Sequence, residues 1–415
     1  MAKTATQNDL SAVSGTAQAG WQETTLGEVA SSIAYGYTES ATKEKIGPKF
    51  LRITDIQDDF INWNKVPYCP ISENNHQKYK LKIGDVVVAR TGNSTGATAT
   101  IKQDVDAVFA SYLIRFSIDP KKADYKFIDF LLRSNFWKGF VGSVKGGSAQ
   151  GGANAKNFAG FPISLPPLPE QHAIAAVLSS LDNKIESLRK QNQTLEAIAQ
   201  NIFKRWFVEF KFPGCEKVNM VDSELGEIPE EWKVGKLGDE FEIIMGQSPS
   251  GESYNEAKEG MIFFQGRAEF QERFPKTRLY TTEPKRIAEK FDVLVSVRAP
   301  VGDINVASEK CCIGRGLGAV RGRYKFYALY KIKSLKEVFD KFETEGTVFG
   351  SINKDGFLNI AVVIPKEEIF TQFESVTNPI DKKIFNNYLQ IQTLSTLRDT
   401  LLPRLMRGEV RVKGF

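Results

Sequence analysis

Histidine and cysteine are scarce in this sequence, which has two histidines and four cysteines among its 415 residues. His76 and His172 lie in different segments, so a metal site or a catalytic triad built on histidine is not expected. The spacing of the cysteines matches no zinc pattern; they are Cys69, Cys215, Cys311 and Cys312. We expect reduced thiols, which fits a cytoplasmic protein.

Other common signatures are missing as well. The glycine-rich segment 92–96 lacks the lysine of a phosphate-binding loop. No stretch approaches the roughly 18 apolar residues that a membrane span needs. Residues 1–20 are rich in Ala, Ser, Thr, Gln and Gly, without the order of a signal peptide, and are predicted to be a disordered leader.

An internal repeat is the main feature that is present. Segment 154–205 matches the segment 199 residues later without a gap: Asp182 pairs with Asp381, Ile185 with Ile384, and Leu195 with Leu394. The first copy predicts a long helix, because neither glycine nor proline occurs between the Pro-rich start at 165–169 and about Phe210, and the second copy predicts a matching helix. Pro403 is expected to end or kink the second helix at about Leu402.

Apolar residues in both copies recur at alternating steps of three and four, as in a coiled coil. The predicted pairing seam consists of Leu178, Leu181, Ile185, Leu188, Asn192, Leu195, Ile202, Ile380, Ile384, Asn387, Ile391, Leu394 and Leu401. Asn192 and Asn387 either fix the register or simply make the seam imperfect. The sequence shows neither a parallel nor an antiparallel alignment, but an antiparallel pair would give a pseudo-twofold molecule with a globular segment near each end.

The globular segments, 21–165 and 232–364, have mixed secondary structure. Short β-branched runs at 85–89, 292–297 and 359–364 predict strands, whereas 125–140 and 325–342 look helical. The resulting organisation is a leader (1–20), a first globular segment (21–165), a first helix (166–212), a linker (213–231), a second globular segment (232–364) and a second helix (365–410). The predicted class is α+β, with two long helices that pair as an antiparallel coiled coil.

Polar, glycine-rich loops follow similar strands in both globular segments. Arg90 and Arg298 each leave a strand into a small-residue loop, and 145–152 is matched by 346–351. Glycine allows close approach of a partner, and Arg, Asn, Gln and Ser reach phosphates and base edges. The net charge of the globular segments gives little support for nucleic-acid binding. Segment 21–165 has 18 Lys and Arg against 14 Asp and Glu, and segment 232–364 has 21 against 18.

The repeat and its flanking motifs resemble the specificity subunits of type I restriction–modification enzymes. The resemblance is carried by Leu-Pro-Pro-Leu-Pro-Glu-Gln at 165–171 with Leu-Asp-Asn-Lys-Ile at 181–185, by Leu-Gly-Glu-Ile-Pro-Glu-Glu-Trp at 225–232, and by Leu-Leu-Pro-Arg-Leu-Met-Arg-Gly-Glu at 401–409. These motifs cover about 100 residues, and the layout covers nearly the entire chain.

The resemblance implies a non-catalytic subunit with two target-recognition domains, each reading one half of a split, asymmetric site in double-stranded DNA. The helices would set the spacing and dock two methyltransferase subunits, which would support the restriction and motor subunits. This chain would bind no cofactor, while S-adenosylmethionine, ATP and Mg²⁺ would bind the partners. The DNA-facing residues would be Arg90, Thr91, Asn93, Ser94, Lys145, Ser148, Gln150, Gln247, Ser248, Gln265, Arg267, Arg298 and Ser351.

Two other functions stay open at this point. One is a two-headed coiled-coil scaffold that joins proteins without binding DNA. The other is the recognition subunit of a related restriction enzyme that cuts on both sides of its site.

Overall fold

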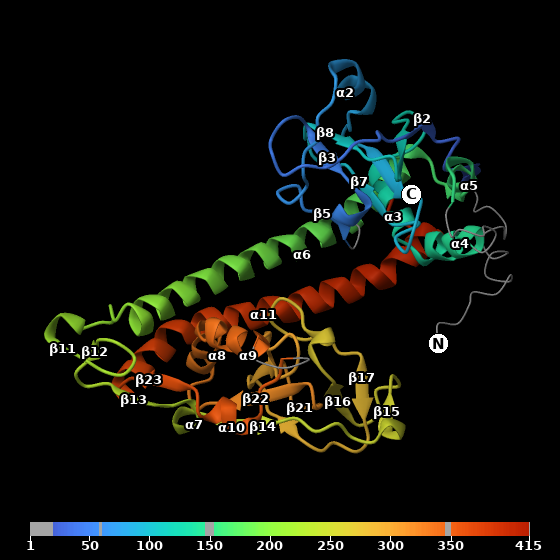
Figure 1. Cartoon of the computed structure of the whole chain (residues 1–415). Helices are drawn as coiled ribbons and strands as arrows, with labels where there is room; N and C mark the ends of the chain where they lie inside the picture. The colour runs from blue at the N-terminus through green and yellow to red at the C-terminus, as the bar shows by residue number, and fades with distance from the viewer. Residues whose placement is uncertain (1–19, 58–59, 146–152, 345–349, 415) are drawn as a thin grey trace. The chain divides into compact units, whose positions relative to one another are not determined.

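The computed structural model describes residues 20–57, 60–145, 153–344 and 350–414, so all but Gly20 of the predicted leader lies outside the described residues. The chain divides into two compact units: unit 1 comprises Met1–Ser187 and Gln390–Phe415, and unit 2 comprises Leu188–Leu389. Each unit therefore combines one globular segment with part of both long helices (Figure 1).

A four-stranded antiparallel sheet forms the centre of each globular segment, in the order β2-β9-β6-β7 in unit 1 and β14-β22-β19-β20 in unit 2. The strands are β2 (Ala30–Tyr35), β9 (Leu113–Ile118), β6 (Asp85–Ala89), β7 (Thr98–Thr100), β14 (Glu242–Met245), β22 (Leu317–Arg321), β19 (Val293–Ser296) and β20 (Ile304–Val306). Every residue of β6 and β19 is buried, as their runs of Val and Leu predict for strands covered on both faces.

A second sheet region distinguishes the two units. Both contain a parallel pair, β3 (Lys49–Leu51) with β8 (Ala107–Phe109) and β16 (Met261–Phe264) with β21 (Cys311–Ile313). In unit 2 this pair belongs to a five-stranded sheet, β15-β17-β16-β21-β18, with β15 (Tyr254–Asn255), β17 (Leu279–Thr281) and β18 (Ile287–Ala288). In unit 1 the pair forms a two-stranded sheet with isolated bridges from Lys49 to Tyr68 and from Val108 to Lys80, and the hairpin of β4 (Ile56–Gln57) and β5 (Phe60–Ile61) is a separate sheet.

Short helices follow the central sheet in the same order in both units. They are α3 (Tyr125–Leu132), α4 (Asn135–Lys145) and α5 (Ala155–Ala159) in unit 1, and α8 (Lys325–Ser334), α9 (Lys336–Thr344) and α10 (Lys354–Leu358) in unit 2; α2 (Glu73–Tyr79) and α7 (Leu237–Glu240) lie elsewhere in the two segments. The helical predictions 125–140 and 325–342 thus each cover two helices. Asp124 caps α3 by accepting from the backbone N–H groups of Lys126 and Phe127.

An antiparallel strand pair joins each globular segment to the long helices. It consists of β1 (Gln22–Thr25) with β10 (Pro162–Leu165) in unit 1, and of β13 (Lys233–Lys236) with β23 (Ala361–Ile364) in unit 2. The strand expected over 359–364 therefore begins two residues later, after α10. The linker 213–231 contains a small hairpin of β11 (Met220–Val221) and β12 (Ile228–Pro229).

The long helices are α6 (Leu168–Phe203), continued by a π-helical turn at Lys204–Val208, and α11 (Glu367–Met406). Within each unit a segment of α6 lies beside a segment of α11 and runs antiparallel to it (Figure 1). None of the 13 predicted seam residues is exposed, and Leu178, Ile185, Leu188, Ile384 and Asn387 are buried. Among the described residues, no helix has the length and apolar character to cross a membrane.

The expected end of α11 at Leu402 is not found, because the helix continues through Pro403 to Met406. Proline removes one backbone donor from a helix but leaves its own carbonyl available. The Pro403 carbonyl accepts from the backbone N–H of Arg407. Leu405 and Met406 are both buried in the core of unit 1, so burial of the last turn outweighs the lost hydrogen bond.

Candidate nucleic-acid interface

The first predicted loop, in unit 1, holds its arginine against the protein. Arg90 Nε donates to the Ser111 carbonyl over 3.0 Å, and its guanidinium lies 5.1 Å from the centre of the Tyr35 ring. Gly96 has φ +87°, and an added Cβ would come within 2.4 Å of Val141 in α4. The packing of α4 thus requires glycine here and fixes the loop. Asn93 is exposed, whereas Thr91 and Ser94 are half-buried.

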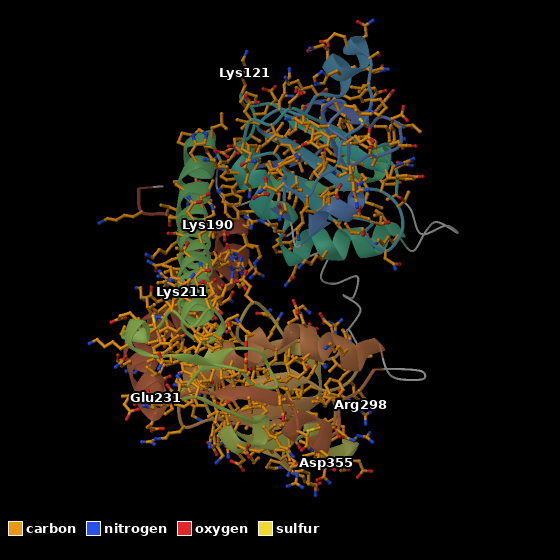
Figure 2. The ribbon with its side chains drawn as sticks, turned by 60° about the vertical axis from the view of Figure 1, so that its left-hand side comes forward. Lys121, Lys190, Lys211, Glu231, Arg298 and Asp355 are labelled. Atoms are coloured by element: carbon orange, nitrogen blue, oxygen red, sulfur yellow. The ribbon has the colours of Figure 1, made fainter. Side chains whose placement is uncertain are left out.

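The corresponding loop in unit 2 leaves its arginine in solvent. Arg298 is exposed at the surface of this unit (Figure 2). Its backbone bridges Ser351, and Ala299 N–H donates to the Gly350 carbonyl over 2.9 Å. No described residue makes a side-chain hydrogen bond or an ion pair with Arg298. The backbone is therefore held, and the guanidinium is available to a partner.

The structure corrects the predicted equivalence of Arg90 and Arg298. Ala153 N–H donates to the Arg90 carbonyl, whereas Ile352 N–H, 199 residues after Ala153, donates to the carbonyl of Val297. Arg90 therefore corresponds to the buried Val297, and Arg298 corresponds to Thr91. The loops begin one residue apart, so the two arginines occupy different positions on the same scaffold.

Of the three predicted residues in 145–150, the structure describes only Lys145. Lys145 is the last residue of α4 and is half-buried. Ser148 and Gln150 fall in 146–152, outside the described residues.

In unit 2 the remaining predicted residues gather where β14, β16 and β21 end. Gln247 N–H donates to the Ile313 carbonyl, and Ser248 Oγ accepts from the backbone N–H of Arg315. Gln265 follows β16 and is exposed. Arg267 forms an ion pair with Asp303. The backbone contacts thus bring together residues separated by more than 60 positions.

Arg315 is a further candidate on this unit that the sequence interpretation did not include. It is exposed, and it lies between Gly314 and Gly316 in the turn that joins β21 to β22. A Gly-Arg-Gly triplet directly after a buried strand is the signal that could have identified it. No described residue binds its side chain.

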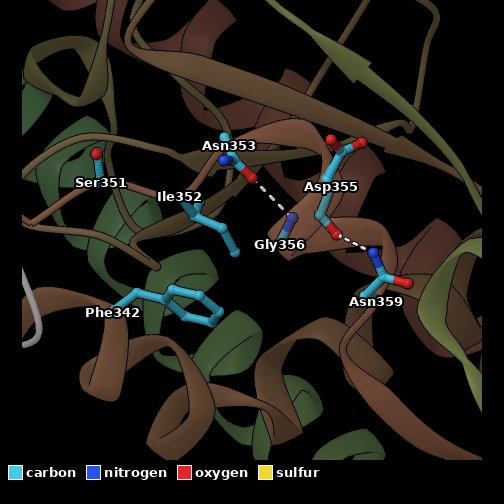
Figure 3. A pocket seen from close by; sticks show the side chains of 7 residues that line it. All are labelled: Phe342, Ser351, Ile352, Asn353, Asp355, Gly356 and Asn359. Atoms are coloured by element: carbon cyan, nitrogen blue, oxygen red, sulfur yellow. Dashed lines mark hydrogen bonds between the residues drawn. The ribbon is translucent and has the colours of Figure 1, made fainter.

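Unit 2 has a shallow hollow of about 350 Å³ beside Ser351, the residue whose backbone bridges that of Arg298. Figure 3 shows its lining, which consists of Phe342, Ser351, Ile352, Asn353, Asp355, Gly356 and Asn359. Asn353 Oδ1 accepts from Gly356 N–H at the start of α10, and Asn359 Nδ2 donates to the Asp355 carbonyl (Figure 3). These amides stabilise the helix. Within the described residues, no group of His, Cys, Asp or Glu is arranged to hold a metal ion.

An ionic junction, partly buried in unit 1 and buried in unit 2, joins each globular segment to the helices, and the repeat places an aspartate at equivalent positions in both. In unit 1, Asp182 accepts from Arg133 of the globular segment over 3.0 Å and from Arg398 of α11 over 2.9 Å. Burial alone would raise the pKa of Asp182, but the two arginines outweigh it and lower this pKa below its ordinary value.

In unit 2, Asp381 occupies the position equivalent to Asp182. Arg273 binds both Asp381 of α11 and Glu196 of α6, and Tyr330 of α8 donates to Asp381 over 2.8 Å. Lys333 also binds Glu196. Burial raises the pKa of Glu196, but Arg273 and Lys333 reverse this effect and lower it. This junction connects three elements of the unit through one arginine.

A layer of amides lies in the helix pair of unit 2. Asn387 Nδ2 donates to Asn192 Oδ1 over 2.8 Å and to Gln191 Oε1 over 2.7 Å. The side chain of Asn387 is fully buried, so the two acceptors on α6 satisfy its amide N–H groups in place of water, while its Oδ1 has no partner among the described residues. The arrangement favours the interpretation that these asparagines fix the register.

Comparison with known proteins identifies the family. A family model described as the type I restriction modification DNA specificity domain matches residues 18–197 and 229–392, most of the chain. The chain belongs to this family. Its architecture, with two mixed α/β segments and two long helices, is that of a specificity subunit.

The chain resembles several known specificity subunits over nearly its full length. The MjaX type I restriction enzyme specificity subunit of Methanocaldococcus jannaschii is 32% identical over 404 residues, which span 95% of this chain and 94% of the relative. The HindI specificity subunit of Haemophilus influenzae is 22% identical, spanning 94% of this chain and 99% of the relative. A crystal structure of a type I restriction–modification S subunit from M. genitalium shares the fold, with a TM-score of 0.57 and 16% identity over 93% of this chain and 96% of that one.

Proposed function

We propose that each unit of this chain reads one half of a bipartite, asymmetric DNA site in a type I restriction–modification complex. The observation that carries the proposal is the pair of matching scaffolds with different loop side chains. The order of strands and helices in the central sheet regions is the same in both units, yet Arg298 corresponds to Thr91 and Val297 to Arg90. One scaffold used twice with different polar side chains suits two different half-sites.

The remaining roles in the complex follow from this proposal. The chain is a non-catalytic subunit that acts in the cytoplasm, where the DNA is. S-adenosylmethionine, ATP and Mg²⁺ bind to partner subunits. Two methyltransferase subunits dock on this chain, and the restriction and motor subunits join through them. The helices set the spacer between the half-sites.

The genome's methylation pattern tests the proposed function directly. The chain is expressed with its methyltransferase partners in a host that lacks the system, and methylated motifs are mapped with and without the chain. We expect a split motif with a fixed spacer only when the chain is present. A methyltransferase that modifies the same motif without the chain would contradict the proposal, and so would a complex that never methylates a defined sequence.

Arg298→Ala tests one proposed contact. We expect the variant to fold and assemble, and to lose about 1–3 kcal/mol of discrimination at one half-site if Arg298 binds a guanine with two hydrogen bonds. Competition binding with single base-pair variants of the motif measures the loss. Arg323→Ala is the control, because Arg323 is exposed and paired with Glu367. Unchanged affinity and methylation would remove Arg298 from the interface.

Exposed apolar side chains on the helices indicate where methyltransferase subunits dock. Ile198 of α6 is 44% exposed, and Leu397 of α11, 199 residues later, is 45% exposed. They belong to unit 2 and unit 1, respectively. An exposed apolar residue at equivalent positions of a repeat suits one kind of partner that binds twice.

Glutamate substitutions at these two positions are expected to change the stoichiometry stepwise. A carboxylate buried in an apolar interface is costly, so Ile198→Glu or Leu397→Glu alone should leave one methyltransferase bound, and the double variant none. Native mass spectrometry or multi-angle light scattering measures the composition. Gln372→Glu adds the same charge at another exposed helix position and should retain both partners. Two bound methyltransferases on the double variant would show that they dock elsewhere.

A further inference from the structure

The turn 314–316 in unit 2 is held by the backbone at several points. Gly314 N–H donates to the Phe264 carbonyl over 2.8 Å, and Leu317 N–H donates back to the Gly314 carbonyl over 3.0 Å. The Gly316 carbonyl accepts from Val297 N–H over 3.0 Å. The backbone N–H of Arg315 itself donates to Ser248 Oγ over 3.2 Å. The Cα of Arg315 is therefore fixed relative to β14, β16 and β19.

Close packing explains why glycines surround Arg315. A Cβ on Gly314 would lie 2.8 Å from the Gln265 carbonyl oxygen, and one on Gly316 would lie 3.1 Å from it. A Cβ on Gly246 would lie 2.1 Å from the Gly314 carbonyl oxygen. Three loops thus meet with almost no space between their backbones. Only the side chain of Arg315 projects from the turn into solvent.

The other arginines of this segment have partners, with few exceptions. Among the described residues 232–344 and 350–364, side-chain ion pairs engage Arg267, Arg273, Arg278, Arg321 and Arg323. Arg286, Arg298 and Arg315 form none with described residues. Arg298 and Arg315 flank the hydrogen bond between Val297 and Gly316, so two unpaired guanidinium groups originate at one edge of the unit.

The same turn in unit 1 carries different side chains. In unit 1 the backbone N–H of Arg90 donates to the Tyr112 carbonyl, and in unit 2 the N–H of Val297 donates to the Gly316 carbonyl. Tyr112 therefore corresponds to Gly316, and Ser111, the residue before it, corresponds to Arg315. All four arginines of segment 21–165 contact the protein; they are Arg52, Arg90, Arg115 and Arg133. Unit 1 therefore presents a serine and the exposed Tyr112 where unit 2 presents an arginine that pairs with no described residue.

We propose that Arg315 reads a guanine in the half-site recognised by unit 2, and that this turn distinguishes the specificities of the two units. The proposal rests on the proposed DNA-reading function. A planar guanidinium on a fixed backbone can donate two hydrogen bonds to O6 and N7 of guanine in the major groove. Ser111 cannot make this contact, so unit 1 has no arginine readout at this position.

Substitutions of Arg315 in the full chain, assembled with its methyltransferase subunits, separate base reading from phosphate binding. Competition binding uses duplexes that carry every single base-pair change in the motif. Arg315→Ala should lower the preference for guanine at one position of one half-site by roughly 5- to 150-fold. Arg315→Lys keeps the charge but not the two-bond geometry, and should lose most of the same preference. The methylated motif should become degenerate at that position only.

The controls keep failure of this inference distinct from failure of the proposed function. Arg323→Ala, two residues beyond the end of β22 that is farther from Arg315, should retain the wild-type motif and affinity. A wild-type complex without sequence preference would overturn the proposed function. A wild-type motif that Arg315→Ala leaves intact would overturn only the role of Arg315. An equal loss of affinity for all duplexes, rescued by Arg315→Lys, would also overturn it, because it would show a phosphate contact. Thermal unfolding of each variant verifies that the chain is folded.

Discussion

Replacing Arg273 with alanine is expected to lower the free energy of unfolding of unit 2 by about 3–5 kcal/mol. The guanidinium is 8% exposed and compensates Asp381, whose carboxylate is fully buried. Removing the cation leaves that carboxylate with Tyr330 as its remaining hydrogen-bond donor among the described residues. Urea unfolding measures the loss, and hydrogen exchange in α8 and α11 locates it. The surface variant Arg323→Ala should cost under about 1 kcal/mol, because Arg323 is 79% exposed.

The pH dependence of this variant has a defined sign. Burial raises the pKa of Asp381, whereas Arg273 lowers it. Without Arg273 the pKa should rise further, so the folded variant binds a proton that the unfolded chain releases. Its stability should therefore increase as the pH falls toward the ordinary carboxyl range, and the gap to the wild type should narrow.

A second substitution tests whether the buried charge is the cause. Asp381→Asn keeps an acceptor for Tyr330 but removes the charge, so Arg273→Ala with Asp381→Asn should be more stable than Arg273→Ala alone. If the double variant is the less stable of the two, the arginine acts through packing and not through charge. A loss as small as that of Arg323→Ala would contradict the importance of the junction altogether.

Local patterns in the sequence predicted the two long helices, the helical segments 125–140 and 325–342, and one central strand of each four-stranded sheet. The runs at Asp85–Ala89 and Val293–Ser296 are strands, and the offset of 199 places Asp182 and Asp381 at equivalent junctions. Periodicity and burial determine such elements within a few neighbouring residues. Gly84, which precedes β6, has φ 92°, and Phe291, at the equivalent position before β19, has φ 68°. The turn before the strand therefore keeps its left-handed backbone although glycine is replaced by phenylalanine.

The loop residues were harder to predict, because strand pairing between distant segments places them. Ser248 and Arg315 are 67 positions apart, and their contact depends on the pairing of β14 with β22 and of β16 with β21. The one-residue offset between Arg90 and Arg298 became visible only from two long-range hydrogen bonds, Ala153 N–H to the Arg90 carbonyl and Ile352 N–H to the Val297 carbonyl. No local sequence pattern predicts these contacts. The partners of Arg273 likewise come from α6, α8 and α11.

Lengthening both long helices by three heptads is expected to lengthen the spacer of the recognised site by about 9 base pairs. The insertions follow Ser187 in α6 and Leu389 in α11, where the division between the units crosses each helix. Whole heptads preserve the seam, and 21 residues add about 31 Å at 1.5 Å per residue. At about 3.4 Å per base pair, this is close to one turn of DNA. Both half-sites would then face nearly the same side of the duplex as before.

One heptad provides the discriminating comparison. It adds about 10 Å, or about 3 base pairs, which turns one half-site by roughly a third of a turn. We therefore expect the one-heptad variant to methylate its longer site more weakly than the three-heptad variant methylates its own. Motif mapping reads both spacers. An insertion into α6 alone should disrupt pairing, since Asn387 would lose its partners on that helix. A longer helix pair that still methylates the original spacer, or that changes the half-site sequences, would show that the helices do not set the spacing.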